Sequence, residues 1–300
     1  MQVPYIDTPD QVISSNGRPI AIFNTDGNNI DQKVVSEFGE EWSKFNDFSD
    51  EIIKECGDEY FDILQPHMVN DRTTALDIGC GTGRWTKYLS AKVGFIEAVD
   101  PSNAIFAAAK LLEGIRNVRL TKASVETLPF PDESFDFAMS IGVLHHIPDT
   151  QQAMIDCVKK VKKGGYFFVF LYYNFDKRGF LFKSIFSMSD ILRRGVSRLP
   201  GSLKKFVCDL LAIVLYMPFI LIVRFFRVIG LKKIAMKLPL SSYYNKNFFV
   251  IRNDALDRFG TRLEQRFSEK QIIDMMNKSG LGDIIVSQGI PLYHAIGRKI

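Results

Sequence analysis

The sequence predicts an α/β fold in which helices cover both faces of a doubly wound, mostly parallel sheet. Two observations carry this prediction. Short apolar segments alternate with amphipathic helical segments from about residue 70 to residue 175, and such alternation is typical of a parallel sheet. The stretch ALDIGCGTGRWTKYLS at residues 75–90 passes from a strand pattern through three glycines into a helix pattern, as expected where a strand turns into a helix.

An arm and two helices are expected before this alternation. Residues 1–30 are rich in turn formers and are interpreted as an irregular N-terminal arm or a short β-hairpin. After Asp31, apolar residues recur at steps of four, four and three, which places them on one helical face. They are Val34, Phe38, Trp42 and Phe45. A second helical pattern, around Ile52 to Leu64, is expected to end near Pro66.

The alternating part then gives five strands with helices between them. The strands are expected at residues 73–79, 95–100, 118–123, 135–141 and 165–173, and the helices at about 82–91, 102–113 and 150–161. Near the C-terminus, a helix at about residues 269–278 precedes the segments GDIIVSQG and PLYHAIGRK. These two segments are interpreted as a strand pair joined through Gly289, Ile290 and Pro291.

Residues 176–265 do not follow the alternation and are interpreted as a helical, basic and apolar insert. The predicted organisation is thus an arm at 1–30, the first part of the core at 31–175, the insert, and a C-terminal part at 266–300 that completes the core. Residues 210–223 form a 14-residue apolar run that only Pro218 interrupts. Because a membrane-spanning helix needs about 20 apolar residues, we expect a peripheral or substrate-covering lid rather than a span.

The positive charge of the chain is concentrated in this insert. Residues 177–237 contain thirteen Lys or Arg against two Asp, a local net charge of +11, so that the rest of the chain carries −7 of the total +4. This asymmetry favours an anionic surface or ligand as a partner of the insert, although long cationic side chains can also simply solvate an exposed face. Nucleic acid is not expected, because the basic region coincides with an apolar run.

Neither secretion nor a metal site is indicated. The N-terminus has no basic segment followed by an apolar segment, so a cytoplasmic location is expected, with membrane association open through the insert. The four cysteines are scattered, without a C-x-x-C pair or a histidine at zinc-ligand spacing. We therefore predict buried thiols and no metal.

The glycine-rich turn predicts a ligand with an amino group and a ribose. Gly79, Gly81 and Gly83 follow a G-x-G-x-G pattern, which lets a ligand approach the main chain at a helix N-terminus. Asp77, two residues before the first glycine, suits a cationic amine, whereas it would repel a pyrophosphate. Asp100 ends the next strand, where a carboxylate can accept ribose hydroxyls. This pattern opposes an NAD-dependent oxidoreductase, which uses G-x-G-x-x-G.

These residues, together with ASVETLPFPDESFD at 123–136 and SIGVLHHIPD at 140–149, resemble the class I S-adenosylmethionine-dependent methyltransferases. The similarity is to the broad group that includes the ubiquinone- and menaquinone-pathway enzymes, and it covers about residues 70–175 and 265–300. The resemblance implies a seven-stranded Rossmann-like methyltransferase sheet with an antiparallel last strand, a helical insert after strand 5, and S-adenosyl-L-methionine as the cofactor.

The resemblance also implies a set of cofactor-binding residues near the ends of the first four strands. They are Asp77, Gly79, Gly81, Gly83, Asp100, Ser124, Val125 and Ser140. The glycines would wrap the amino-acid end of the cofactor, and Asp100 would hold its ribose. Many relatives carry Asp where this chain has Ser124, and a hydroxyl accepts a hydrogen bond more weakly than a carboxylate.

Catalysis by a methyltransferase mainly requires that a nucleophile be positioned in line with the activated methyl group. His146, with His145 as the weaker candidate, is the expected general base if the nucleophile must lose a proton, although both imidazoles could be structural. Tyr172, Tyr173 and Trp42 are candidates for substrate contact, and core packing explains them equally well.

The predicted function is methyl transfer to a small-molecule or lipid-like acceptor, with a preference for O-methylation that rests on family breadth alone. An anionic membrane surface is a candidate partner. The alternatives are transfer to carbon or nitrogen of another acceptor, or a non-catalytic subunit with the methyltransferase fold.

Overall fold

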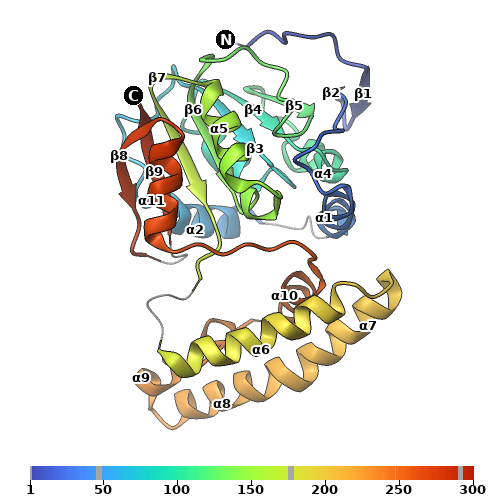
Figure 1. Ribbon diagram of the computed structural model, residues 1–300, viewed down its shortest axis with the longest axis vertical. Helices are drawn as coiled ribbons and strands as arrows, with labels where there is room; N and C mark the ends of the chain where they lie inside the picture. Colours follow the sequence, from blue (N-terminus) through green and yellow to red (C-terminus); the bar gives the residue numbers. More distant parts are fainter. Residues whose placement is uncertain (1, 45–48, 175–178, 247, 290–292) are drawn as a thin grey trace. The chain divides into compact units, whose positions relative to one another are not determined.

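The computed structural model describes residues 2–44, 49–174, 179–246, 248–289 and 293–300 (Figure 1). The chain divides into two compact units, residues 1–174 with 265–300 (unit 1) and residues 175–264 (unit 2). Of the features expected from the sequence, Phe45, Ile290 and Pro291 lie outside the described residues, as does the side chain of Trp42.

Within the described residues, unit 1 is built on one sheet with the strand order β1-β2-β5-β4-β3-β6-β7-β9-β8. The strands are β1 Gln11–Ser15, β2 Arg18–Ile22, β3 Thr74–Ile78, β4 Phe95–Val99, β5 Val118–Lys122, β6 Phe135–Ile141, β7 Val161–Phe170, β8 Leu281–Val286 and β9 His294–Lys299. Strands β3 to β7 are parallel, whereas β9 runs antiparallel to both β7 and β8. The predicted doubly wound α/β fold with an antiparallel last strand is confirmed.

The expectation of seven strands needs correction, because β1 and β2 form a hairpin that extends the same sheet. Of the two alternatives expected for residues 1–30, an irregular arm or a short β-hairpin, the structure has the hairpin. Asn16 and Gly17 turn the hairpin with φ values of 48° and 70°, and β2 pairs parallel with β5. Arg18 fixes this edge by donating from its guanidinium to the Val118 carbonyl at 2.7 Å. Ile20, opposite Leu120, is fully buried, so the apolar side of the hairpin belongs to the core.

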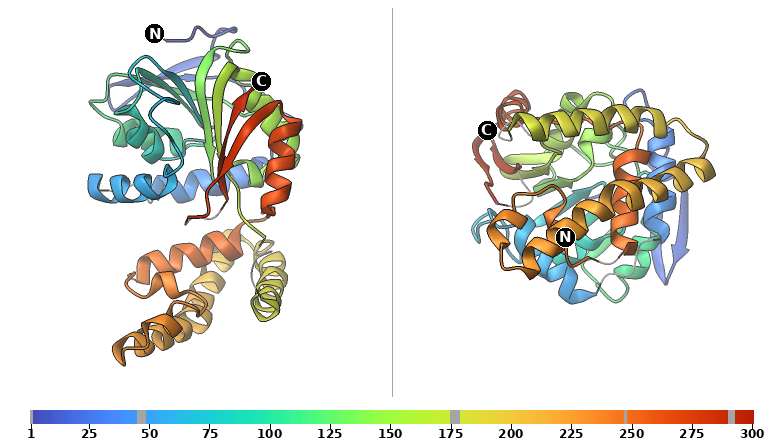
Figure 2. Two further views of the ribbon diagram at one scale, coloured as in Figure 1. Left: turned by 90° about the vertical axis from the view of Figure 1, so that its left-hand side faces the viewer. Right: turned by 90° about the horizontal axis from the view of Figure 1, so that it is seen from below.

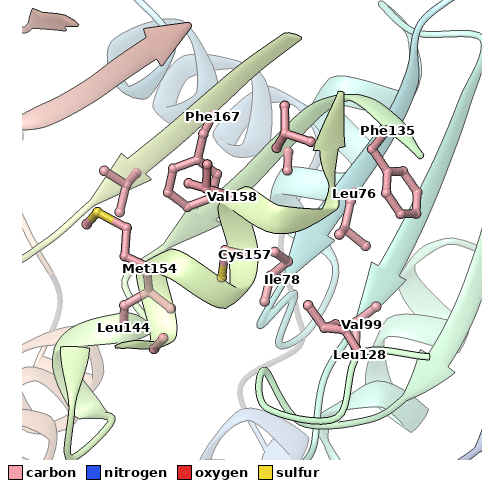
Figure 3. Close-up of a cluster of buried hydrophobic side chains, with 14 of the residues drawn as sticks. Leu76, Ile78, Val99, Leu128, Phe135, Leu144, Met154, Cys157, Val158 and Phe167 are labelled. Atoms are coloured by element: carbon pink, nitrogen blue, oxygen red, sulfur yellow. The ribbon is translucent and has the colours of Figure 1, made fainter. Parts of the chain in front are cut away.

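Helices cover both faces of the sheet (Figure 2). They are α1 Gln32–Lys44, α2 Asp50–Tyr60, α3 Arg84–Ser90, α4 Ala104–Leu111, α5 Thr150–Lys160 and α11 Glu269–Lys278. Helices α5 and α11 bury apolar side chains in one core cluster, which includes Leu76, Phe135 and Phe167 (Figure 3). Residues of α3 and α4 belong to a second cluster, together with Phe137 and Phe168 of the strands. The alternation of neighbours such as Phe167 and Phe168 between the two clusters follows from the pleat of β7.

Unit 2 is helical, with its own small core. Its helices are α6 Phe180–Val196, α7 Gly201–Leu211, α8 Met217–Val228, α9 Lys232–Ala235 and α10 Phe248–Gly260. A π-helical turn, Ala212–Tyr216, joins α7 to α8 without a break, so that Ser202–Val228 is one helix of 27 residues. A proline disturbs the helical turn before it, and this wider turn directly precedes Met217 and Pro218. By length and composition alone this helix is apolar enough to cross a membrane, so its length does not distinguish the expected peripheral lid from a span.

Candidate functional site

The candidate site lies where the parallel strands end at their carboxyl edge, as expected for this fold class. Asp77, near the end of β3, is 1% exposed, and its carboxylate accepts a hydrogen bond from the Thr86 hydroxyl at 2.6 Å. Burial raises the pKa of Asp77 to about 7; the hydrogen bond from Thr86 acts in the opposite direction, and the nearby Asp100 adds to the rise. A cationic group beside Asp77 would therefore be strongly stabilising.

Asp100, after β4, organises the turn from the neighbouring strand. The Gly81 amide donates to its Oδ2 atom at 2.8 Å, while the amide and hydroxyl of Ser102 both donate to Oδ1. Burial raises the pKa of Asp100, and these hydrogen bonds oppose the shift. Of the roughly four acceptor positions of a carboxylate, these hydrogen bonds occupy three, so one remains for a ligand hydroxyl.

The turn is shaped so that a ligand can reach its main chain. Gly79, Gly81 and Gly83 all have φ values between 54° and 81°, a region that side chains disfavour. A Cβ atom at Gly79 would lie 2.4 Å from a methyl group of Val143. At Gly81, by contrast, a Cβ atom would meet no described atom within 4 Å. This open position and the buried carboxylate of Asp77 fit a ligand with a cationic amine.

The remaining cofactor candidates lie on neighbouring strand ends. Ser124, which follows β5, is buried, and its hydroxyl is hydrogen-bonded to that of Thr127 at 2.8 Å. Val125 beside it is partly buried. Ser140 is fully buried and donates to the carbonyl of Ile78 at 3.0 Å. The hydroxyl of Ser140 thus ties β6 to the strand end that carries the glycine turn.

The two histidines of the loop after β6 have different environments. His145 is fully buried, neither of its ring nitrogens has a hydrogen-bond partner among the described residues, and its ring stacks on Tyr172 at 3.9 Å between centroids. Burial lowers the pKa of His145 well below its usual value, and the positive charges of His146 and Arg266 add to this shift. His146 keeps 8% exposure, and its ring lies 4.7 Å from that of Phe38 in α1. His146 is therefore the more accessible of the two.

The two tyrosines lie beyond the end of β7, which stops at Phe170 rather than at residue 173 as expected. Tyr172 packs with the cluster that contains α3 and α4, whereas Tyr173 packs with the opposite cluster. Tyr172 stacks on His145, whereas Tyr173 contacts Tyr293 with a centroid distance of 5.9 Å.

A strand-like segment, residues 265–267, holds this region in place. The Gln265 amide donates to the His145 carbonyl at 3.0 Å, and the Phe267 amide donates to the Tyr172 carbonyl at 2.8 Å. The side chain of Gln265 also donates to the Ile147 carbonyl at 2.8 Å. Sequence reasoning did not identify this segment, because backbone hydrogen bonds between residues roughly 100 positions apart leave no local pattern.

Helix α1 also contributes residues that the sequence reasoning did not assign to the site. Phe38 contacts His146, and a Cβ atom at Gly39 would lie 3.1 Å from the Asn103 amide, just after Asp100 and Ser102. The absence of a side chain at Gly39 thus allows α1 to approach this strand end closely. Thr86 and Ser102 were missed as well, although a hydroxyl two residues after Asp100 is a recognisable signal.

No cluster of His, Cys, Asp or Glu among the described residues is suited to hold a metal ion.

Comparisons with known proteins match the part of the chain that carries these strand ends. Residues 76–169 match the family model described as "Methyltransferase domain". The chain is 35% identical over 107 residues to a demethylmenaquinone methyltransferase of Bacillus licheniformis, covering 34% of this chain and 46% of that protein. It is 32% identical over 132 residues to an uncharacterized protein of Methanocaldococcus jannaschii, covering 44% and 58%. The chain thus spans about half the length of these curated relatives.

A solved structure supports the fold over a longer range. A chain from the complex between the Haloferax volcanii Trm112 methyltransferase activator and its methyltransferase partner superposes with a TM-score of 0.50 and 12% identity, over 88% of this chain and 97% of the other. The family model and the demethylmenaquinone methyltransferase confirm, for residues 76–169, the class I methyltransferase domain that the sequence motifs indicate.

Proposed function

We propose that this chain, whose core is a class I methyltransferase domain, transfers a methyl group from S-adenosylmethionine to a small, amphiphilic acceptor. The observation that carries the proposal is the buried Asp77 carboxylate beside the open turn at Gly81, with Asp100 on the next strand end. A ligand with a cationic amine and a ribose fits this arrangement, whereas the pyrophosphate of a dinucleotide would be repelled.

In this proposal each part of the site holds a part of the cofactor. Asp77 pairs with its ammonium group, the backbone around Gly79, Gly81 and Gly83 receives its amino-acid end, and Asp100 binds the ribose. Ser124 and the backbone of Val125 are assigned to the adenine. Ser140 is assigned an indirect role, because its hydroxyl is used to hold the Ile78 carbonyl at the start of the turn.

The cofactor supplies a methyl group that is already activated on a sulfonium. The chain therefore has to exclude water, orient the acceptor and, where the acceptor atom carries a proton, remove that proton. His146 is the proposed base because it keeps some exposure and adjoins α1. His145 cannot easily take up a proton in its buried position, so its proposed role is to pack under Tyr172 and fix the loop.

The acceptor is proposed to be amphiphilic and of small-molecule or lipid-like type. One relative is named for its action on demethylmenaquinone, and the apolar and basic composition of unit 2 suits an acceptor with an oily part. O-methylation is the preferred reaction on family breadth, with transfer to carbon or nitrogen as the alternative. Nucleic acid is not a proposed partner. A cytoplasmic location is proposed, with unit 2 as the part that can associate with a membrane.

A second candidate function is that of a non-catalytic subunit that binds the cofactor. It is favoured by Ser124, whose hydroxyl is engaged with Thr127 and replaces the carboxylate that many relatives use. The intact glycine turn opposes a subunit that has lost the cofactor site, whereas a subunit that binds the cofactor without transferring its methyl group would keep the turn.

Two measurements test the proposal in sequence. Isothermal titration should detect binding of S-adenosylmethionine and S-adenosylhomocysteine but not of NAD; binding of NAD alone would contradict the assignment of the site. Incubation with methyl-labelled S-adenosylmethionine and an extract of the source cells should then place protein-dependent label in the solvent-extractable fraction. Label confined to the aqueous fraction would contradict a lipid-like acceptor, and cofactor binding without any transfer would favour the non-catalytic subunit.

A further inference from the structure

The long helix of unit 2, Ser202–Val228, has two faces of different character. One face is buried against α10 and the other helices of the unit through residues spaced by four, four, four and three. They are Cys208, Ala212, Tyr216, Ile220 and Val223. The opposite face exposes large apolar side chains at intervals of three, four or seven residues, and we call it the apolar stripe. It consists of Leu203, Phe206, Leu210, Val214, Leu221, Phe225 and Val228.

No charge interrupts the middle of this stripe. Every exposed side chain between residues 206 and 223 is apolar, including Ile213, Phe219 and Ile222 beside the stripe. Only 28% of the most apolar part of the helix is buried, whereas the core helix of a soluble domain is mostly buried. Continuous apolar surfaces of this kind are uncommon on soluble proteins and mark a surface that binds something.

The charges at the ends of the stripe identify the partner. Lys205 is exposed at its start, and Lys232, Lys233 and Lys237 are exposed just after its end. Next to these C-terminal lysines lie exposed apolar side chains of the same segment, namely Leu231, Ile234 and Met236. Long cationic side chains next to apolar ones place their charges at a water boundary, and such a pattern attracts anionic lipid head groups.

The contacts on the buried face of the helix indicate its orientation relative to a bilayer. Asp209 forms an ion pair with Arg252 of α10, with 2.7 Å between Asp209 Oδ2 and an Arg252 nitrogen. Tyr216, at the centre of the helix, donates to the Asp254 carboxylate at 2.7 Å. A transmembrane orientation would carry these charged groups of α10 into the hydrocarbon, which is unfavourable for each. An orientation in the plane of the membrane keeps them on the aqueous side.

We propose that unit 2 docks on an anionic lipid bilayer through the apolar stripe, with the helix Ser202–Val228 lying in the plane of the interface. The exposed lysines at both ends contact the head groups, and α10 covers the aqueous side. This docking is independent of methyl transfer, so that either proposal can fail without the other.

The test is cosedimentation of the full chain with phosphatidylcholine vesicles, with and without phosphatidylserine. We expect binding that requires phosphatidylserine and weakens with added salt. The double variant Leu210→Ser/Phe225→Ser should bind at least about tenfold more weakly, since each side chain contributes buried apolar area. The matched control is Val12→Ser, which alters an apolar side chain of similar exposure in β1 of unit 1 and should bind like the wild type.

Further measurements distinguish docking in the plane of the membrane from misfolding, dimerisation and a membrane span. Circular dichroism and S-adenosylmethionine binding should be unchanged in the double variant, which shows that it is folded. Lys232→Glu/Lys233→Glu should reduce the preference for phosphatidylserine. No binding to either vesicle, an equal loss in Val12→Ser, or a dimer in light scattering that the stripe variant dissociates would overturn the proposal. Vesicle binding that resists alkaline extraction would overturn the in-plane orientation and indicate a span.

Discussion

Asp77 should make cofactor binding depend on pH. Its pKa in the folded chain is about 7 because the carboxyl is buried, whereas its ordinary value is 3.8. A cationic amine binds well only to the ionised form, so the affinity should rise with pH up to about 7 and then level off. If ionised Asp77 is required, the affinity falls about tenfold for each pH unit below 7. It should be about tenfold weaker at pH 6 than at pH 8.

The same pKa has the opposite effect on the stability of the free protein. Because the folded-state pKa lies above the unfolded value, the folded chain holds a proton between about pH 4 and pH 7 that the unfolded chain has lost. The free energy of unfolding should therefore fall as pH rises through this range, by roughly a few kcal/mol at most. Binding and stability thus change in opposite directions over the same interval.

The assay is isothermal titration with S-adenosylmethionine from pH 5.5 to pH 8, in parallel with thermal unfolding of the free protein. Asp77→Asn should weaken binding at pH 8 by about tenfold or more and flatten the pH profile. Glu97→Gln is the matched control, because burial raises the pKa of Glu97 to about 7 as well, but its carboxylate pairs with Arg119 and Thr121. This control should lower the stability and change its pH dependence, because Arg119 loses its charged partner, but it should leave the pH profile of cofactor binding unchanged. An affinity that stays within twofold across the range, or an equal flattening in Glu97→Gln, would refute the reasoning.

Two further predictions concern the histidine loop and the glycine turn. If His146 is the base, His146→Ala should lower turnover by about 100-fold and leave the cofactor affinity unchanged, whereas His145→Leu should change turnover by no more than a few-fold. Turnover is measured by steady-state kinetics and cofactor affinity by calorimetry. An effect of only a few-fold for His146→Ala would exclude His146 as the base. Gly79→Ala should lower the free energy of unfolding by about 2 to 4 kcal/mol, since it combines a positive φ with a clash against Val143. Gly114→Ala, with a φ of 80° but open space, should cost only about 1 kcal/mol; equal losses in chemical denaturation would show that the contact with Val143 is unimportant.

The parts of the fold that follow from local pattern could be predicted from the sequence. Strand β6 and helix α11 begin and end as expected, because their apolar spacing and, for α11, the capping residues Ser268 and Gln271 are local signals. The pairing of β2 with β5 could not be predicted, since it joins residues about a hundred positions apart. The end of β7 was placed three residues too late, because Leu171 to Tyr173 continue the apolar run but leave the sheet.

In the candidate site as well, local sequence pattern identifies some residues, whereas others are identified only by contacts in the folded chain. Asp77 and Asp100 were found from their positions before and after the glycines, which is a pattern along the chain. Thr86 and Gly39 could not be selected in this way. Thr86 belongs to the candidate site through its hydrogen bond to Asp77, and Gly39 belongs to it because α1 approaches Asn103 closely. The sequence cannot show that the neighbouring residues His145 and His146 have different environments, because the difference comes from their burial and from the stacking of His145 on Tyr172.

The backbone hydrogen bond between Asn174 and Phe267 bears on which changes of unit 2 the sheet can tolerate. The Asn174 amide donates to the Phe267 carbonyl at 3.0 Å, so the two points at which unit 2 leaves and rejoins the sheet are neighbours in space. A module attached through adjacent ends can be exchanged for another without stretching the structure that carries it. A different helical module could therefore be grafted between residues 174 and 265, by evolution or by design, while the sheet and the glycine turn stay as they are.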